Sequence, residues 1–321
     1  MNIKRIRTEK NMSQQALADA LGYRTRSTIA KIESGENDVS QKKLIKIAAA
    51  LGTTIDALIS EHPVELSPAP EIRLPAEMKR NRNAVIILAG GESSVNRQNI
   101  PNQFVSVHNK PIIVFCMEAY EAHPAIDDII VVCSKGWENI VHAYAAQFHI
   151  SKLKGVVSGG ESGVTSLKNG MEHLVKAQYK PEDIVIIQEA TRPMINTETI
   201  SKLLLACMEK GSATICHFMD DYVQFDISGN RPKYMDRKST IALQSPEAHS
   251  MKLLTEVFYK CRQLRHPLTE SCLTMLLYNL NYDICFIEGG INNIKIASED
   301  DLLFFEALTR TKHGSYVAQE R

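Results

Sequence analysis

Residues 84–104 read AVIILAGGESSVNRQNIPNQF, and this stretch decides the fold of most of the chain. The apolar, β-branched run at its start predicts a buried strand. Ala89, Gly90 and Gly91 then open a polar loop at the carboxyl end of that strand. Backbone N–H groups in a glycine-rich loop at this edge of a sheet can face phosphate oxygens without obstruction by Cβ atoms. On its own, the stretch also fits a tight turn after a core strand.

Further strand and helix patterns alternate along the rest of the chain. Short apolar runs bounded by turn residues predict strands, and amphipathic segments between them predict helices. The predicted strands are 84–88, 128–133, 155–157, 183–187, 213–217, 283–287 and 294–296. The predicted helices are 111–121, 137–148, 163–174 and 197–210. This alternation predicts an α/β doubly wound domain, in which a mainly parallel sheet carries helices on both faces.

Length, charge and cysteine usage narrow the class of protein. The 321 residues predict about two domains. Lysine plus arginine and aspartate plus glutamate each total 37, so the overall charge indicates neither a nucleic-acid nor a membrane partner. The sequence has no apolar run of the roughly 18 residues that a membrane span needs, and no signal-peptide pattern. Seven scattered cysteines form no C-x-x-C pair, which predicts reduced thiols in a cytoplasmic protein.

Residues 1–61 predict a separate all-α domain of five short helices. Ser13 precedes a helix with an apolar stripe of 3.6-residue period and a terminal glycine. Thr25 is the expected cap of the next helix, 26–34, whose two isoleucines face inward. Ser40 is the expected cap of a helix over 41–51, and Thr54 is the expected cap of a helix over 55–59.

The same residues resemble the lambda-repressor/Cro-type helix-turn-helix. The motifs that carry the resemblance are Ser13-Gln14-x-x-Leu17-Ala18, Leu21-Gly22, Ser27-Thr28-Ile29-x-Lys31-Ile32-Glu33-x-Gly35 and Leu44-x-x-Ile47-Ala48-x-x-Leu51-Gly52. In that fold the second helix of the motif enters the major groove of double-stranded DNA. The resemblance therefore implies a set of DNA-reading residues: Arg24, Arg26, Ser27, Thr28 and Lys31. It also implies a dimer on a two-fold site, because one such domain makes few base contacts.

The charge of residues 1–61 agrees with a DNA partner. Ten lysine and arginine residues and seven acidic residues give a net charge of +3 (10 − 7), which favours a DNA-docking face. The alternative is a helical protein-interaction module with a solvated polar face. Residues 62–82 contain four prolines among polar residues and predict an extended tether between the first domain and a second domain over 83–321.

The second domain resembles the cytidylyltransferases that make CDP-methylerythritol and CDP-ribitol. The signature of that family begins with L-A-A-G-x-G-x-R-M and then P-K-Q. In this chain, the start of the signature matches Leu88-Ala89-Gly90-Gly91 and its end matches Pro101-Asn102-Gln103-Phe104. Later matching segments are 158–170, 187–193, 236–237, 244–247 and 289–302. The resemblance implies a Rossmann-like nucleotidyltransferase fold that binds CTP, a polyol phosphate or a CDP-polyol.

The resemblance also implies roles for residues at matching positions. The implied nucleotide-binding residues are Ala89, Gly90, Gly91, Gly159, Gly160, Ser166 and Glu189. The implied phosphate-binding residues are Arg192, Lys295 and, across a dimer interface, Arg237 of a projecting arm. Mg²⁺ is the implied cofactor, since Glu189 replaces an aspartate associated with Mg²⁺ and a glutamate can still ligate a hard cation. Structural alternatives remain: Arg192 can brace a loop, Lys295 can be an exposed edge lysine, and the glycines can serve a turn.

Cations of the family are missing at three positions. Aligned from Pro101, the catalytic arginine of the family falls on Val95 and its lysine on Asn102, while a further arginine falls on Gly163. In the family such cations neutralise the triphosphate as a substrate phosphate displaces pyrophosphate, and no side chain forms a bond. Arg97, two positions along the loop from Val95, is an alternative source of positive charge.

We therefore expect a cytoplasmic, homodimeric transcription regulator whose cytidylyltransferase-like domain has lost turnover and senses a ligand. The alternative is an active cytidylyltransferase that transfers CMP from CTP to methylerythritol 4-phosphate or ribitol 5-phosphate and carries an appended DNA-binding domain. A third interpretation is that the large domain serves only for dimerisation. Val95 and Asn102 argue against the enzyme, and Lys295 and Arg192 argue against a bare dimerisation platform.

Overall fold

The computed structural model divides into two compact units, Met1–Ile72 and Arg73–Arg321. The residues that it describes are 3–10, 12–23, 25–34, 41–51, 53, 58, 81–91, 100–219 and 222–317, with only the backbone described for 41, 42, 44, 45 and 310–317. The predicted site residues Arg24, Val95 and Arg97 lie outside the described residues, as do the predicted caps Ser40 and Thr54. Among the described residues, no helix has both the length and the apolar character that crossing a bilayer requires.

The described part of the small unit contains four helices. They are α1 (Ile3–Glu9), α2 (Gln14–Ala20), α3 (Ser27–Glu33) and α4 (Gln41–Ala50). The Ser13 hydroxyl accepts a hydrogen bond from the backbone N–H of Ala16 at 3.0 Å, which confirms the predicted cap of α2. The predicted cap of α3 is wrong. Its cap position is Arg26, which makes no side-chain capping hydrogen bond, and the Thr25 hydroxyl is paired with the Ser27 hydroxyl at 2.9 Å.

One apolar core holds the small unit together. Its buried members are Ile3, Ile6, Leu17, Ala18, Ile29, Ile32, Ile47, Ala48, Leu51 and Leu58. Ile29 and Ile32 lie in it as predicted, because they share one face of α3. Complete burial of a leucine or isoleucine side chain contributes about 1.5–3 kcal/mol. Each of these described core side chains therefore contributes a sizeable share of the stability of the unit.

A buried ion pair links the first three helices. Glu33, at the end of α3, accepts a hydrogen bond from Arg7 of α1 at 2.6 Å and another from Gln14 of α2 at 2.8 Å. The side chains of Arg7 and Glu33 are only 11% and 3% exposed. Burial raises the pKa of the Glu33 carboxyl, but the hydrogen bonds from Arg7 and Gln14 outweigh burial and the net pKa is lowered. Glu33 is therefore charged at neutral pH and holds three helices at once.

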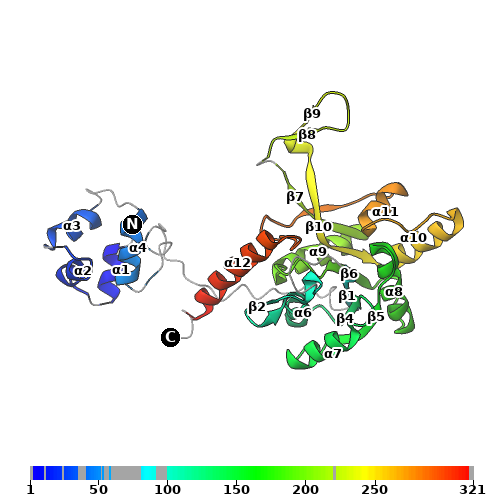
Figure 1. Cartoon of the computed structure of the whole chain (residues 1–321), viewed down its shortest axis with the longest axis horizontal. Helices are drawn as coiled ribbons and strands as arrows, with labels where there is room; N and C mark the ends of the chain where they lie inside the picture. Colours follow the sequence, from blue (N-terminus) through cyan, green and yellow to red (C-terminus); the bar gives the residue numbers. More distant parts are fainter. Residues whose placement is uncertain are drawn as a thin grey trace. The chain divides into compact units, whose positions relative to one another are not determined.

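A seven-stranded sheet forms the centre of the large unit, in the order β11-β7-β10-β6-β1-β4-β5 (Figure 1). Its strands are β1 (Asn83–Ala89), β4 (Asp128–Cys133), β5 (Leu153–Ser158), β6 (Ile184–Glu189), β7 (Ser212–Phe218), β10 (Ile241–Ser250) and β11 (Phe286–Glu288). The helices around it are α6 (Ile112–Ala122), α7 (Glu138–Gln147), α8 (Gly163–Lys176), α9 (Thr197–Lys210), α10 (Met251–Leu264), α11 (Leu273–Asn279) and α12 (Glu299–Val317). β1 runs parallel to β4 and β6, which confirms the predicted doubly wound α/β fold.

Strand β1 is buried on both faces, and its alternating side chains enter two separate cores. The side chains on one face, packed with α6, α7 and α9, are Val85, Ile87 and Ala89. Those on the other, packed with α8, α10 and α11, are Ala84 and Ile86. Gly170 lets α8 approach the second face closely, since a Cβ atom there would lie 2.9 Å from Cγ2 of Ile86. The period-two pattern of the strand thus fixes a three-layer arrangement.

The observed sheet differs from the prediction in two places. Strand β10 is absent from the predicted set and runs antiparallel to both β6 and β7. Polar residues at Gln244, Ser245 and Glu247 hide its strand pattern, and its burial comes from its neighbours in the sheet. The predicted strand 294–296 is wrong. A backbone hydrogen bond of 2.8 Å from Ile296 to the Thr191 carbonyl holds that segment as a loop.

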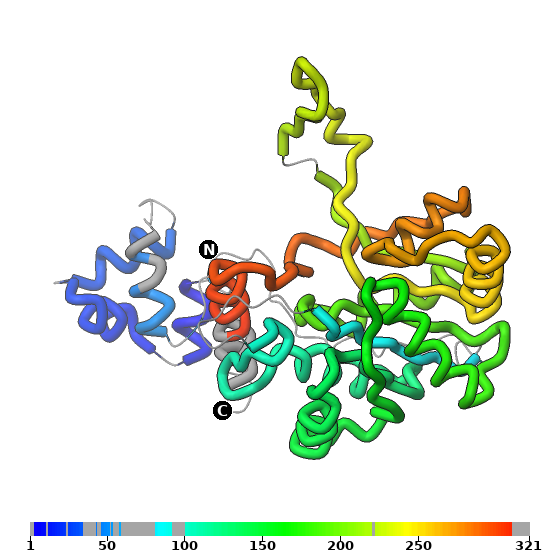
Figure 2. The backbone as a smooth tube through the Cα atoms, turned by 45° about the vertical axis from the view of Figure 1, so that its right-hand side comes forward, coloured from blue at the N-terminus to red at the C-terminus, as the bar shows by residue number. Residues whose placement is uncertain are grey.

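A hairpin of β8 (Gln224–Asp226) and β9 (Lys233–Met235) projects from the body of the large unit in both views (Figures 1 and 2). Its apolar side chains face solvent, and Phe225, Ile227 and Tyr234 are 53%, 79% and 52% exposed. The hairpin is at the position of the predicted projecting arm. The remaining short elements are η2 (Asn102–Phe104), β2 (Ser106–Val107), β3 (Lys110–Pro111) and η3 (Arg237–Ser239).

We expect Glu33→Ala to lower the free energy of unfolding of the small unit by about 3 kcal/mol, because it leaves the Arg7 guanidinium without its buried partner. Glu9→Ala is the matched control. Glu9 pairs with Arg5 where the side chains are 56% and 41% exposed, and its loss should cost less than about 1 kcal/mol. Denaturant titration of the full chain, followed by circular dichroism, measures both variants.

The Arg7–Glu33 pair also predicts a pH dependence. Because the pKa of Glu33 is lowered from 4.5, the stabilisation is complete above that pH and is lost as the pH falls below it. The difference between wild type and Glu33→Ala should therefore shrink in acid. Equal destabilisation by Glu33→Ala and Glu9→Ala at neutral pH would contradict this account of the small unit.

Candidate functional site

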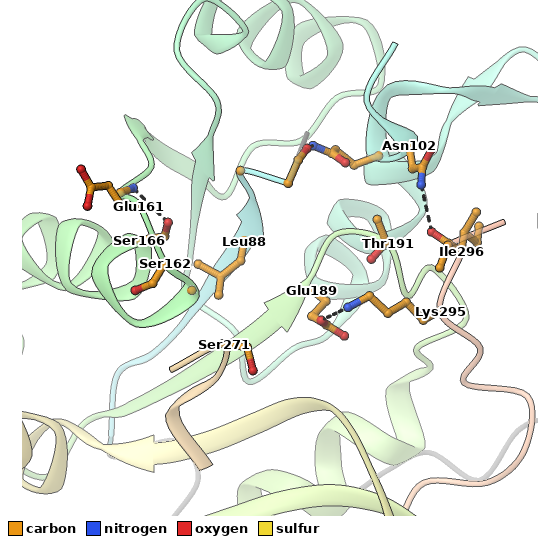
Figure 3. Close-up of a pocket in the computed structure, with 16 residues that line it drawn as sticks. Leu88, Asn102, Glu161, Ser162, Ser166, Glu189, Thr191, Ser271, Lys295 and Ile296 are labelled. Atoms are coloured by element: carbon orange, nitrogen blue, oxygen red, sulfur yellow. Dashed lines mark hydrogen bonds and ion pairs between the residues drawn. The ribbon is translucent and has the colours of Figure 1, made fainter. Parts of the chain in front are cut away.

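The carboxyl ends of β1, β5 and β6 meet at one edge of the sheet, and the loops that follow them line a cavity of about 330 Å³ (Figure 3). The chain order reverses here on the two sides of β1, and open α/β sheets bind ligands at such a point. The predicted positions that line the cavity are Gly90, Gly91, Asn102, Gly160, Gly163, Ser166, Glu189 and Lys295. The fold thus brings together residues from distant parts of the sequence.

One wall of the cavity is built around Ser166 of α8. Its hydroxyl accepts a hydrogen bond from the backbone N–H of Gly160 at 3.0 Å. A Cβ atom on Gly90 would lie 3.8 Å from the same oxygen, so the two glycine loops close around it. Helix α8 begins with a capping box in which Ser162 accepts from the N–H of Thr165 at 3.0 Å. This wall offers backbone and hydroxyl groups, which suit uncharged hydrogen-bonding parts of a ligand.

The segment after Pro101 anchors the loop that follows β1. Gln103 donates hydrogen bonds to the carbonyls of Ala89 at 2.7 Å and Gly91 at 2.9 Å. Asn102 is 1% exposed and donates to the Ile296 carbonyl at 3.4 Å (Figure 3). The position of the family lysine therefore holds a neutral, buried amide. Ala89 acts through its backbone and does not itself line the cavity.

Glu189, at the end of β6, is paired with two cations. Its Oε1 atom is 2.5 Å from Nζ of Lys295 (Figure 3), and its Oε2 atom is 2.7 Å from Nε of Arg192. Arg192 also donates to the carbonyl of Asn293 at 2.8 Å. Burial raises the pKa of the Glu189 carboxyl, but the charge and hydrogen bond of Lys295, and then those of Arg192, outweigh burial and the net pKa is lowered. The carboxylate is therefore charged at neutral pH and compensates both cations.

The position of the third family cation is closed by the main chain. A Cβ atom on Gly163 would lie 2.8 Å from the carbonyl carbon of Ser271 and closer still to its oxygen. The same loop is docked on the start of α8 by two hydrogen bonds. Val164 donates its N–H to the Glu270 carbonyl at 3.4 Å, and the Ser162 hydroxyl donates to the Leu268 carbonyl at 2.6 Å. A side chain at residue 163 therefore requires the backbone to move.

A second cavity, of about 280 Å³, adjoins the first. The residues common to both are Leu88, Glu189, Ser271 and Lys295. Arg192 and Glu247 line the second cavity. Glu247 is 4% exposed, and its carboxylate accepts hydrogen bonds from the backbone N–H groups of Leu273 at 3.2 Å and Thr274 at 3.0 Å. The loop before α11 is thereby fixed, and both cavities form one cleft.

The charges of the cleft disfavour a triphosphate. Among the described residues that line the two cavities, the cations are Lys295 and Arg192 and the carboxylates are Glu161, Glu189 and Glu247. The described side chains also do not form a Mg²⁺ site of their own. Both oxygens of Glu189 are in ion pairs, and no group of three His, Cys, Asp or Glu residues within the described ranges could hold a metal ion. Mg²⁺ at Glu189 stays a prediction.

Two other predicted residues lie outside the cleft lining. Gly159 donates its N–H to the Cys133 carbonyl at 2.8 Å and supports the loop from behind. Arg237 is exposed in η3, directly after the projecting hairpin. Gln103, Glu247 and Ser271 also line the cleft, although none of them was predicted as a site residue. Gln103 and Glu247 lie inside the matching segments 101–104 and 244–247, whereas no local pattern marks Ser271.

Helix α3 and its cap position carry four of the five predicted DNA-reading residues, and the fifth, Arg24, lies outside the described residues. Arg26, Ser27 and Lys31 are exposed, and Thr28 is half-buried. Ile29 and Ile32, on the other face, lie in the core. The helix therefore presents two cations and a hydroxyl on the side that packing leaves free, as the second helix of the motif requires for the major groove.

Comparison with known proteins finds two family models along the chain. The model of 2-C-methyl-D-erythritol 4-phosphate cytidylyltransferase matches residues 83–311, and that of the helix-turn-helix matches residues 3–58. The two matches confirm both predicted resemblances.

Individual relatives match the large unit. A ribitol-5-phosphate cytidylyltransferase of Lacticaseibacillus paracasei is 31% identical over 229 residues, which cover 71% of this chain and 97% of that protein. The enzyme of the same name from Vibrio parahaemolyticus is 30% identical and covers 73% of this chain and 99% of its own length. The solved structure of 4-diphosphocytidyl-2C-methyl-D-erythritol synthase from Anaerococcus prevotii has a TM-score of 0.62 at 18% identity, covers 74% of this chain and 99% of its own, and confirms the fold class.

Proposed function

Residues 83–311 of this chain belong to the 2-C-methyl-D-erythritol 4-phosphate cytidylyltransferase family and residues 3–58 to a helix-turn-helix family, and from this pairing we propose a DNA-binding transcription regulator. Its large unit binds a ligand in the cleft and no longer catalyses nucleotidyl transfer. The observation that carries the proposal is that uncharged residues occupy the three positions where the family has cations. Val95 is apolar, Asn102 is a buried amide, and Gly163 is closed by the main chain.

Nucleotidyl transfer depends on these cations because the protein contributes no covalent step. Catalysis rests on positioning and on neutralisation of the charge that develops on the triphosphate. Removing one preorganised donor of this kind typically costs about 10²–10³ in rate. Losses within one cluster do not simply multiply. The amide of Asn102, already bonded to the Ile296 carbonyl, nevertheless supplies none of the missing charge.

Ligand binding places a smaller demand on the cleft. The wall around Ser166, the Glu189–Lys295 pair and the buried Glu247 are ordered groups that can hold a cytidine nucleotide, a polyol phosphate or a CDP-polyol. A ligand regulates only if its affinity differs between two arrangements of the protein. A cleft that has kept hydrogen-bonding groups and lost catalytic cations, in a chain that also carries a DNA reader, fits a sensor.

We also propose that the regulator is a cytoplasmic homodimer. The exposed apolar side chains of the β8–β9 hairpin, among them Phe225 and Ile227, form a surface that a second copy can cover. Two-fold pairing through this hairpin would offer Arg237 to the partner and would set the spacing of the two DNA-reading helices.

An active cytidylyltransferase with an appended DNA-binding domain is the second candidate. The observation in its favour is that relatives named ribitol-5-phosphate cytidylyltransferase match along 97–99% of their own length at 30–31% identity. Arg97, near the position of the missing arginine, would then have to supply the charge that Val95 lacks.

A measurement of catalytic turnover distinguishes the regulator without catalysis from the active cytidylyltransferase. With CTP, Mg²⁺ and either ribitol 5-phosphate or methylerythritol 4-phosphate, we expect the full chain to release no pyrophosphate above background. The double variant Val95→Arg with Asn102→Lys should recover only part of the activity, because Gly163 stays closed. A pyrophosphate-release assay measures both proteins. A wild-type rate within the usual enzyme range of roughly 1–10³ s⁻¹ would establish the enzyme instead.

DNA recognition should depend on α3. A duplex selected from a random library by the full chain serves as the operator, and affinity for it should fall steeply with salt as counterions are released. Arg26→Ala should cost about 1–3 kcal/mol at this operator if Arg26 contacts a base edge. Lys168→Ala, an exposed change in the large unit, is the control and should leave affinity unchanged. An equal loss by Arg26→Ala on unrelated DNA would show that Arg26 contacts only phosphate.

A further inference from the structure

The arrangement of Glu189 bears on which ligand the cleft accepts. Its two carboxylate oxygens lie 2.5 Å from Lys295 and 2.7 Å from Arg192, the two lysine or arginine side chains among the described lining of the cleft. We propose that Glu189 is an internal anion that takes the place of a ligand phosphate on these cations and so makes the cleft select ligands of low charge. This inference rests on the proposed function, since it assumes that the cleft binds a ligand.

Neither cation of the described cleft lining is free to bind a phosphate. Arg192 is 13% exposed and is held between Glu189 and the Asn293 carbonyl, at 2.7 and 2.8 Å. Lys295 is 48% exposed and points into the cleft toward Glu189 (Figure 3). An incoming phosphate must therefore displace the Glu189 carboxylate from Lys295 or bind beside it. Displacement leaves a partly buried carboxylate without one of its partners, which costs free energy.

The neighbouring groups do not compensate for that cost. Glu161 and Glu247 also line the cleft, and they carry charge of the same sign as a phosphate. The wall opposite Glu189 is lined by the Ser166 hydroxyl and by the Gly90 and Gly160 backbones. Such groups bind hydroxyl and amide groups well and do not need a ligand charge. The ligand class is therefore a nucleoside or polyol, with phosphate adding little affinity.

Calorimetric titration of the full chain with cytidine, CMP and inorganic phosphate tests the inference. In wild type, CMP should bind no more than about threefold more tightly than cytidine, because its phosphate must displace the Glu189 carboxylate from Lys295 or bind beside it. In Glu189→Gln, which keeps the shape of the side chain and removes its charge, CMP and inorganic phosphate should each gain about tenfold. The readout is the ratio of CMP affinity to cytidine affinity, which should rise about tenfold in this variant over wild type.

Glu161→Gln is the matched control. It removes the same charge from the same cleft, and Figure 3 places Glu161 beside Ser162 and Ser166, away from the Glu189–Lys295 pair. Its CMP affinity should rise by less than about threefold. Thermal melting checks that both variants are folded, and the wild-type ratio of CMP to cytidine tests the inference without any variant.

Two results would overturn the inference. One is a wild-type protein that binds CMP more than about tenfold more tightly than cytidine. The other is a folded Glu189→Gln variant with no gain for phosphate, or with a gain equal to that of Glu161→Gln. The proposed regulatory function fails in a different experiment, operator binding, so failure of one is distinguishable from failure of the other.

Discussion

Burial of β1 on both faces is the constraint on which the large unit depends. Its alternating side chains enter two cores, and β4 and β6 lie alongside it in parallel. Parallel strands end at the same edge of a sheet, so the loop after β1 and Glu189 at the end of β6 must meet there. The cleft is thus a consequence of the core, and it persists when individual residues on its rim change.

The residues that line the cleft determine whether it can catalyse nucleotidyl transfer or only bind a ligand. The buried amide of Asn102 and the closed position of Gly163 remove positive potential, and Glu189 compensates the two cations that remain. Hydrogen-bonding groups around Ser166 are kept. Transfer of a nucleotidyl group needs strong neutralisation of charge, whereas recognition of a nucleoside or polyol needs mainly shape and hydrogen bonds. The same fold can therefore bind without reacting.

The sequence predicted those strands and helices whose own side-chain pattern determines their burial. The apolar run of β1 and the periodic pattern of α9, predicted at 197–210 and observed at Thr197–Lys210, depend on burial of their own side chains. Strand β10 was not predicted because its sequence is polar. It forms a strand because its backbone pairs with β6 on one side and β7 on the other. Ser271 and Gly163 are far apart in the sequence, so no local sequence pattern could predict that they lie against each other. Glu189, Arg192 and Lys295 were each predicted as site residues, yet their mutual neutralisation depends on distances that sequence spacing does not give.

The central claim is that occupancy of the cleft changes DNA binding by the small unit. The most direct measurement is the affinity of the full chain for its selected operator with and without saturating cytidine or CDP-ribitol, with guanosine as the control ligand. A coupling free energy of about 1–3 kcal/mol predicts a shift of roughly 5–150-fold. If calorimetry shows that the ligand fills the cleft while operator affinity stays constant, the large unit is not a sensor and the account is contradicted.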